Sequence, residues 1–277
     1  MPTWLLSLLV LVCLGLAGLG AWLWRTRPWR GPRPRWPVVL VHGILGFDRL
    51  ELGPLRRDYF HGVVEHLRDL GVEVHCPRLP PLGGIAERAE ALAAFLRALP
   101  ARKVNLVAHS MGGLDARWAI SRLGCAPRVA SLTTLGTPHR GTPAADLGVR
   151  LLGLEWGVGA LLSAAGLPGR VLTDLSVQGL ARFDAEAPDA PGVRYFCVPA
   201  SADATGQGVH PLLRPLHAYL QRAAGPNDGL VPAASQVHGQ VLARVRADHW
   251  AEIGWGQGLD APALFVRLLT ELRRRGR

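Results

Sequence analysis

The sequence predicts an α/β fold in which helices cover both faces of a mostly parallel sheet. Two observations lead to this prediction: short apolar runs alternate with longer segments of helical periodicity, and 49% of the 277 residues are hydrophobic, enough for a sizeable core. Alternating strands and helices are typical of parallel sheets with buried strands. In such sheets, chemically active side chains gather at the carboxyl ends of the strands.

Six apolar runs are predicted as buried strands. They lie at 37–43, 72–76, 103–109, 129–135, 193–199 and 240–245. Three segments between them are predicted as helices, at 58–71, 84–100 and 112–124. Each ends in a residue type that commonly stops a helix, glycine or proline.

An insertion at about 144–190 interrupts this alternation, because no convincing strand occurs between Pro143 and Pro191. Its part from Asp146 to Gly169 is apolar almost all round and rich in glycine. One interpretation is a helical lid over an apolar substrate pocket, since such a segment must bury its apolar surface and glycine permits movement. A buried core helix is the other interpretation.

The N-terminal 24 residues differ in character from the rest. No charged residue occurs from Trp4 to Trp24, and a helix of that length spans roughly 30 Å, the thickness of a bilayer core. We therefore predict a transmembrane anchor at 1–24, an Arg- and Pro-rich linker at 25–36, and the main domain at 37–277. By the positive-inside rule, the linker arginines predict a main domain on the cytoplasmic side. The alternative is a signal peptide that is cleaved on export.

The formal charge of +10 is concentrated at the two ends of the chain. Basic and aromatic residues do not interleave as they do on nucleic-acid-binding surfaces, so we expect no nucleic-acid partner. The four cysteines are widely spaced and form no CxxC pair, which argues against a zinc site and a disulfide framework. We expect neither a metal ion nor an organic cofactor.

Ser110 follows the buried run at 103–109 and precedes the helix at 112–124. The surrounding residues, AHSMG, match the strand-turn-helix nucleophile elbow GxSxG with Ala108 in place of the first glycine. The sharp turn needs small residues beside the serine and raises its hydroxyl above the sheet. Ser110 is therefore a candidate nucleophile, and the competing interpretation is an ordinary N-cap serine.

Two backbone N–H groups are candidate donors to an oxyanion beside Ser110. One belongs to Met111, at the N-terminus of the helix. The other belongs to Ile44, in the segment VHGILGF after the first strand. We expect His42 in that segment to support the loop by hydrogen bonding rather than to act as a base.

A serine nucleophile needs a base, and the base needs a carboxylate that orients it. In folds with this elbow, the acid and then the histidine follow the serine along the chain. Asp228 in PNDGLVP and His249 in DHWAEI meet this order. Other residues of the right types remain open as alternatives: Asp203 and Asp248 for the acid, His238 and His139 for the base.

Five motifs follow one another along the chain: VHGILGFD, VNLVAHSMGGLDARW, LTTLGTPHRGT, PNDGLVP and DHWAEI. In this order they resemble the bacterial triacylglycerol lipases of the α/β-hydrolase superfamily, from about residue 37 to the end. The resemblance implies an α/β-hydrolase fold and a serine hydrolase that cleaves fatty acyl esters with Ser110, Asp228 and His249. A lipid or another acyl ester is then the substrate, and the membrane a partner.

The chain departs from this family at two places. Many of these lipases have a disulfide, and a calcium ion near the catalytic histidine that is held in part by an acidic side chain two residues beyond it and an amide further on. Here Ala251 and Trp255 stand at those places and offer no side-chain oxygen, and Cys197 has no obvious partner. We therefore expect activity that does not depend on calcium.

Two other functions are compatible with the same motifs. A thioesterase or an acyltransferase could use the same triad, because fold and triad do not determine the acyl acceptor. A non-catalytic hydrolase-fold module that binds lipid is the third hypothesis. The ordered serine, acid and histidine argue against it.

Overall fold

A parallel sheet of six strands forms the centre of the computed structural model, which describes residues 33–44, 49–52, 55–152 and 169–277. The strand order is β4-β1-β5-β6-β7-β8, and each neighbouring pair is parallel. The strands are β1 (Val38–Val41), β4 (Val74–His75), β5 (Val104–His109), β6 (Val129–Leu135), β7 (Arg194–Val198) and β8 (Gln240–Val241). All six predicted strands are present, but β4 and β8 have only two residues each and are shorter than the predicted runs at 72–76 and 240–245.

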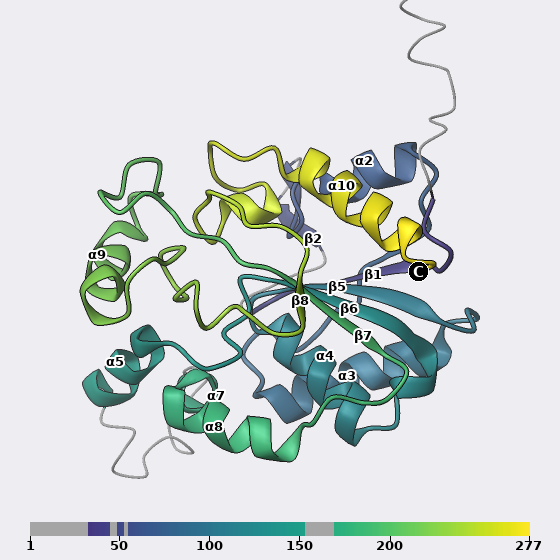
Figure 1. Cartoon of the computed structure of the whole chain (residues 1–277), viewed down its shortest axis with the longest axis horizontal. Helices are drawn as coiled ribbons and strands as arrows, with labels where there is room; N and C mark the ends of the chain where they lie inside the picture. Colours follow the sequence, from purple (N-terminus) through teal and green to yellow (C-terminus); the bar gives the residue numbers. More distant parts are fainter. Residues whose placement is uncertain (1–32, 45–48, 53–54, 153–168) are drawn as a thin grey trace, which may run out of the picture. The chain divides into compact units, whose positions relative to one another are not determined.

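Helices cover both faces of this sheet, as predicted (Figure 1). Alternate residues of β1 belong to different hydrophobic clusters, because successive side chains of a strand point to opposite faces. Val38 and Leu40 pack with α2 (Val63–Asp69) and α10 (Ala261–Arg274). Val39 and Val41 pack with α3 (Ile85–Ala98) and α4 (Gly112–Arg122) on the other face.

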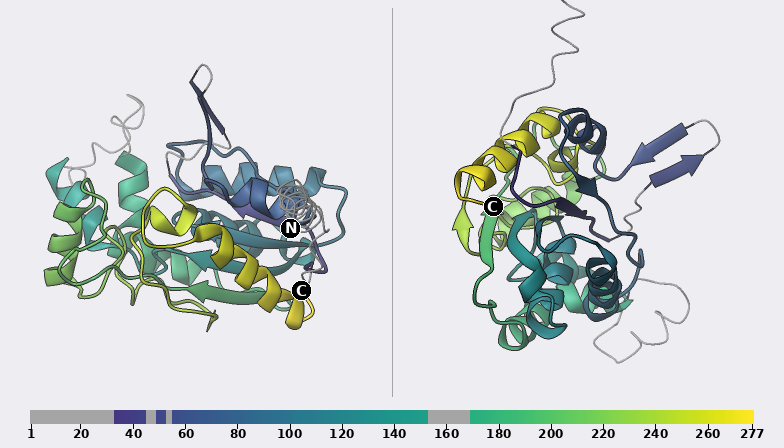
Figure 2. Two further views of the ribbon diagram at one scale, coloured as in Figure 1. Left: turned by 90° about the horizontal axis from the view of Figure 1, so that it is seen from above. Right: turned by 90° about the vertical axis from the view of Figure 1, so that its right-hand side faces the viewer.

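The remaining elements connect these strands and helices. They are α5 (Pro143–Leu151), α7 (Gly169–Leu175), α8 (Val177–Glu186), α9 (Arg214–Ala223), the short 3-10 helices η1 (Ala126–Arg128) and η3 (Ala251–Ile253), and the strands β2 (Arg49–Leu52) and β3 (Leu55–Asp58). Strands β2 and β3 pair antiparallel as a hairpin that projects away from the central sheet (Figure 2).

The insertion expected at about 144–190 contains helices and no strand among its described residues. Helices α5, α7 and α8 contribute to a third hydrophobic cluster together with Met111 and Leu114 at the start of α4. The insertion thus packs beside the candidate nucleophile. Residues 153–168, the greater part of the predicted lid segment 146–169, lie outside the described residues.

The prediction of a single-pass membrane protein with a cytoplasmic main domain is wrong on the evidence of the described residues. None of their helices is long and apolar enough to cross a membrane. The longest, α3 and α10, have 14 residues each, whereas a bilayer core requires about 20. The segment 1–24, to which the anchor was assigned, lies outside the described residues.

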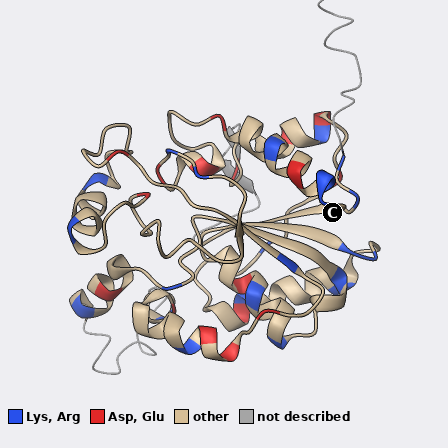
Figure 3. Cartoon of the chain, in the orientation of Figure 1, with Lys and Arg blue, Asp and Glu red and all other residues tan. Residues whose placement is uncertain are grey.

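Three neighbouring strands at the centre of the sheet carry no charged side chain. Strands β1, β5 and β6 contain no Lys, Arg, Asp or Glu. On the helices, acidic and basic residues are interspersed rather than segregated by sign (Figure 3). The charged residues of the candidate site therefore lie outside these three strands.

Candidate active site

Ser110 occupies the turn between β5 and α4 and is the only non-glycine residue with positive φ, 57°, in the described part of the chain. Left-handed backbone is costly for a residue with a side chain, and such strain is typical of functional sites. The Thr137 hydroxyl donates to the Ser110 carbonyl at 2.7 Å, which helps to hold the turn. A Cβ added to Gly112 would lie 2.6 Å from the Val41 carbonyl oxygen, so the turn requires a small residue there.

The loop after β1 lies directly against this turn. A Cβ on Gly43 would be 2.8 Å from the Ser110 Cβ. The Gly43 carbonyl accepts from Arg88 Nη2 at 3.1 Å and from His42 Nδ1 at 2.9 Å. Because the peptide bond is trans, holding this carbonyl on one side directs the N–H of Ile44 to the other side.

His42 supports this loop, as expected from the sequence. Its Nε2 accepts from the Leu79 backbone N–H at 3.1 Å, and its Nδ1 donates to Gly43. Both ring nitrogens are thereby engaged in buried backbone hydrogen bonds. His42 is thus a scaffold residue for the loop that carries Ile44.

Asp228 and His249 are brought together, as predicted. His249 Nδ1 lies 2.8 Å from Asp228 Oδ2, and both residues are buried. Asp228 Oδ1 accepts from the backbone N–H groups of Leu230 and Val231 at 2.8 and 2.7 Å, and Oδ2 also accepts from Gln236 Nε2 at 3.1 Å. This carboxylate is fixed in place and binds Nδ1, which leaves His249 Nε2 as the nitrogen available to a nucleophile.

The alternative acids and bases are engaged in other contacts. Asp203 pairs with Arg246, and hydrogen bonds from Thr205 lower the pKa of this carboxyl. His238 pairs with Asp189 at 2.9 Å, and buried His139 stacks on His238. The carboxylate of Asp248 accepts from three backbone N–H groups, those of His210, Trp250 and Ala251.

A cavity of about 550 Å³ connects Ser110 with His249. Such a volume is ordinary for a small-molecule site. Most of its lining is apolar and includes Ile44 and Trp255. The other apolar lining residues are Pro138, Ala144, Ala145, Leu172, Leu175, Leu216, Leu230, Val231, Trp250 and Ile253.

Glu252 is a fully buried carboxyl beside the candidate base. Burial, followed by the negative charge of Asp228, raises the pKa of Glu252 well above its ordinary value. Two neighbouring carboxyls in a dry site do not both ionise readily, which favours the protonated form of Glu252.

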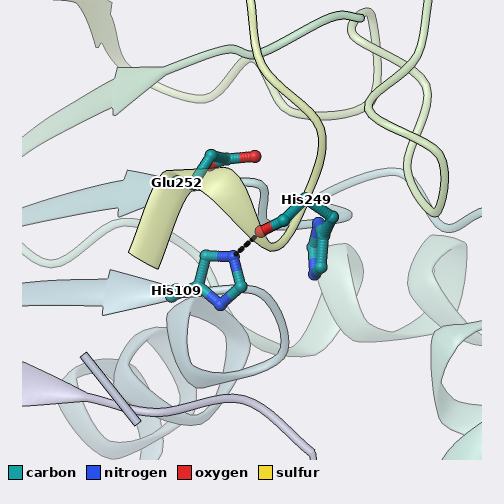
Figure 4. A group of neighbouring side chains, drawn as sticks. All are labelled: His109, His249 and Glu252. Atoms are coloured by element: carbon teal, nitrogen blue, oxygen red, sulfur yellow. Dashed lines mark hydrogen bonds between the residues drawn. The ribbon is translucent and has the colours of Figure 1, made fainter. Parts of the chain in front are cut away.

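His109, His249 and Glu252 have possible metal ligand atoms within 4.8 Å of one another (Figure 4). Both nitrogens of His109 are already used, however: Nδ1 lies 2.8 Å from the Tyr59 hydroxyl and Nε2 lies 3.0 Å from the His249 carbonyl oxygen. His249 Nδ1 is bound to Asp228. Three of the four ring nitrogens of the two histidines are therefore already engaged in hydrogen bonds.

The residues around the His249 loop do not fit a calcium ion either. Calcium takes about six to eight oxygen ligands. Ala251 and Trp255 supply none from their side chains, the Asp248 oxygens are taken by backbone N–H groups, and the Asp203 carboxylate is paired with Arg246.

Sequence reasoning missed three polar residues that support the site. Arg88 falls on the apolar stripe of α3 formed by Ile85, Ala89 and Leu92, and a charged residue at such a position is a signal of a buried ion pair. His109 ends a fully buried strand, and Tyr59 carries no local signal. Its role depends on residues far away in the chain.

Residues 37–267 match the family described as the alpha/beta hydrolase fold. The chain is 30% identical to a triacylglycerol lipase of Vibrio cholerae over 82% of both chains, and 27% identical to triacylglycerol lipase 2 of Saccharomyces cerevisiae over 88% of this chain and 93% of the yeast protein. Among solved structures, the mature Bacillus licheniformis lipase BlEst2 has the same fold, with a TM-score of 0.65 at 24% identity, covering 86% of this chain and 92% of that one. The chain therefore belongs to the α/β-hydrolase superfamily and, within it, to the bacterial triacylglycerol lipase family of carboxylic ester hydrolases.

Proposed function

We propose that the protein hydrolyses acyl esters of lipids, with Ser110 as nucleophile, His249 as base and Asp228 as the acid that orients it. The observation that carries the proposal is the buried His249–Asp228 hydrogen bond of 2.8 Å at the wall of an apolar cavity that Ser110 also lines. The relatives named as triacylglycerol lipases support the substrate class.

In this mechanism the Ser110 hydroxyl attacks the acyl carbonyl carbon while His249 Nε2 takes its proton. Asp228 stabilises the imidazolium and keeps Nδ1 as the donor to its carboxylate. The N–H groups of Ile44 and Met111 donate to the oxyanion, and each such donor is worth roughly 3 kcal/mol of barrier. The tetrahedral intermediate then collapses: the ester C–O bond breaks, and the alcohol leaves with the proton held on His249 Nε2. Water, with His249 again as base, cleaves the acyl-enzyme, which releases the fatty acid and returns the proton to Ser110.

The apolar lining favours an acyl chain over a polar acyl group. A methylene group buried in such a cavity is worth about 0.8 kcal/mol. We therefore expect medium or long p-nitrophenyl acyl esters to be cleaved with lower KM than the acetate.

The test combines covalent labelling with hydrolysis. A fluorophosphonate probe should label the wild type, and Ser110→Ala should abolish labelling. Ester hydrolysis should fall by about three orders of magnitude or more in Ser110→Ala and His249→Ala, whose far-UV circular dichroism should be unchanged.

Asp203→Asn is the matched control for Asp228→Asn. Asp228→Asn should cause a large loss of kcat and Asp203→Asn a small one, because only Asp228 contacts His249. If Asp203→Asn were the damaging change, the acid would be misassigned. Products formed with water and with an added alcohol distinguish a hydrolase from an acyltransferase.

A further inference from the structure

A continuous line of hydrogen bonds runs from the loop of Ile44 to the backbone of His249. The Gly43 N–H donates to the Tyr59 hydroxyl at 3.1 Å. That hydroxyl lies 2.8 Å from His109 Nδ1, and His109 Nε2 lies 3.0 Å from the carbonyl oxygen of His249. His109 immediately precedes Ser110, so the line passes directly beside the nucleophile.

The His249 carbonyl at one end of this line determines which atom donates and which accepts in each of the other contacts. The His249 carbonyl can only accept, so His109 Nε2 carries the proton and donates to it. Neutral His109 then has an unprotonated Nδ1, which accepts the O–H of Tyr59. The Tyr59 oxygen accepts from Gly43 in turn. Every contact in the line thus has one donor and one acceptor.

The line joins segments that are distant in sequence. Tyr59 is 16 residues from Gly43 and 50 from His109, and His109 is 140 from His249. The rings of His109 and His249 are also in contact, with centroids 4.4 Å apart (Figure 4). A shift of Tyr59 or His109 would therefore move the candidate oxyanion donor and the candidate base relative to each other.

We infer that Tyr59 and His109 are positioning residues for ester hydrolysis, which hold the loop carrying the Ile44 N–H and the loop carrying His249 at a set separation on either side of Ser110. The inference rests on the proposed roles of Ser110, His249 and Ile44. Tyr59 and His109 exchange no proton in the reaction.

The electrostatic surroundings agree with this role. Burial, and then the proximity of His249, lower the pKa of His109 well below its ordinary value, so its ring stays neutral. Burial raises the pKa of Tyr59, so its hydroxyl stays protonated. Both shifts favour the neutral forms that this pattern of donors and acceptors requires.

The experiment compares Tyr59→Phe, His109→Leu and the double variant by kcat, KM and thermal unfolding. Each single variant should lower kcat by about 10- to 100-fold with KM nearly unchanged, because small misplacements of catalytic groups cost rate rather than binding. The kcat of the double variant should be no lower than that of the less active single variant, since both changes break the same line of hydrogen bonds. If the fold-loss of kcat in the double variant equalled the product of the two single losses, the two residues would act independently, and the inference would be overturned.

Tyr195→Phe is the matched control. The Tyr195 hydroxyl accepts from the Ala190 backbone N–H at 3.0 Å, and Tyr195 does not line the cavity. This variant should lose a similar hydrogen bond and keep its kcat. If Tyr59→Phe were destabilised to the same extent as Tyr195→Phe and equally active, Tyr59 would be structural only.

Two further variants separate the halves of the line. His109→Asn keeps an acceptor near the place of Nδ1, and His109→Gln keeps a donor near the place of Nε2. Both should be faster than His109→Leu. Fluorophosphonate labelling tests the proposed function independently. If Ser110→Ala were still labelled, the proposed function would fail. If the wild type were labelled at Ser110 and Tyr59→Phe were fully active, only the positioning role would be rejected.

Discussion

At the scale of single residues, hydrogen bonding distinguishes two neighbouring carboxyls that are both fully buried. Asp228 accepts hydrogen bonds from two backbone N–H groups, an amide and His249. Glu252 lies in the same buried site and has a raised pKa. The raised pKa favours the protonated form of Glu252 beside the Asp228 carboxylate that orients the base.

This difference predicts a pH dependence of stability. The pKa of Glu252 is raised above its ordinary value of 4.5 in the folded protein, so the folded state binds the extra proton. The stability that this proton confers is complete below pH 4.5 and is lost as the pH rises, by at most about 1.4 kcal/mol per pH unit. Glu252→Gln, which cannot ionise, should gain stability relative to the wild type between about pH 5 and pH 8, measured by urea unfolding.

The control is Glu90→Gln, a change at an exposed glutamate of α3. Its stability difference from the wild type should stay constant over the same pH range. A constant difference for Glu252→Gln as well would mean that Glu252 is ionised in the folded protein.

At the scale of elements, one buried ion pair joins α3 to α4 and to the loop after β1. Arg88 Nε donates to Asp115 Oδ2 at 2.8 Å, and neither side chain is exposed to solvent. The other guanidinium nitrogens donate to three carbonyls, those of Pro80, His42 and Gly43. The pair thus connects α4, the helix that follows Ser110, with the loop that carries Ile44.

Replacing this pair should separate its effect on stability from its effect on rate. Arg88→Met alone should lower the free energy of unfolding by about 3–5 kcal/mol, because it leaves Asp115 buried without its partner. The double variant Arg88→Met with Asp115→Leu should recover most of that stability. Its kcat should remain low, because the His42 and Gly43 carbonyls still lack their donor. A double variant as active as the wild type would show that the guanidinium serves stability alone.

Local patterns predicted the elements well and the polar network poorly. The run at 129–135 and strand β6 coincide, since a continuous apolar run between turn residues is a strong local signal. Helix α10 was missed although Asp260 caps it and its buried positions recur with helical spacing. Tyr59 and His109 meet through contacts that no local pattern encodes, so their role required the structure.

At the scale of the whole molecule, the loop that carries His249 is held by residues from distant parts of the chain. The His249 N–H donates to the Asp228 carbonyl at 2.8 Å, and Asp248 accepts from His210. The Ile253 carbonyl accepts from the His61 N–H at 2.9 Å, and Trp255 Nε1 donates to the Tyr59 carbonyl at 2.7 Å. The loop that carries His249 is thereby tied to the segment that precedes α2.

These ties predict activity that does not depend on calcium. In the lipase family a calcium ion fixes the loop of the catalytic histidine, whereas here hydrogen bonds from Trp255 and to Asp248 link that loop to the rest of the domain. Ester hydrolysis and thermal unfolding should therefore be unchanged after exhaustive chelation with EDTA. Trp255→Phe, which keeps an aromatic ring but loses the N–H donor to Tyr59, should lower kcat in a way that added calcium does not restore. Activity that disappears on chelation and returns with calcium, but not with magnesium, would mean that backbone carbonyls assemble a calcium site around this loop and that the hydrogen bonds alone do not hold it.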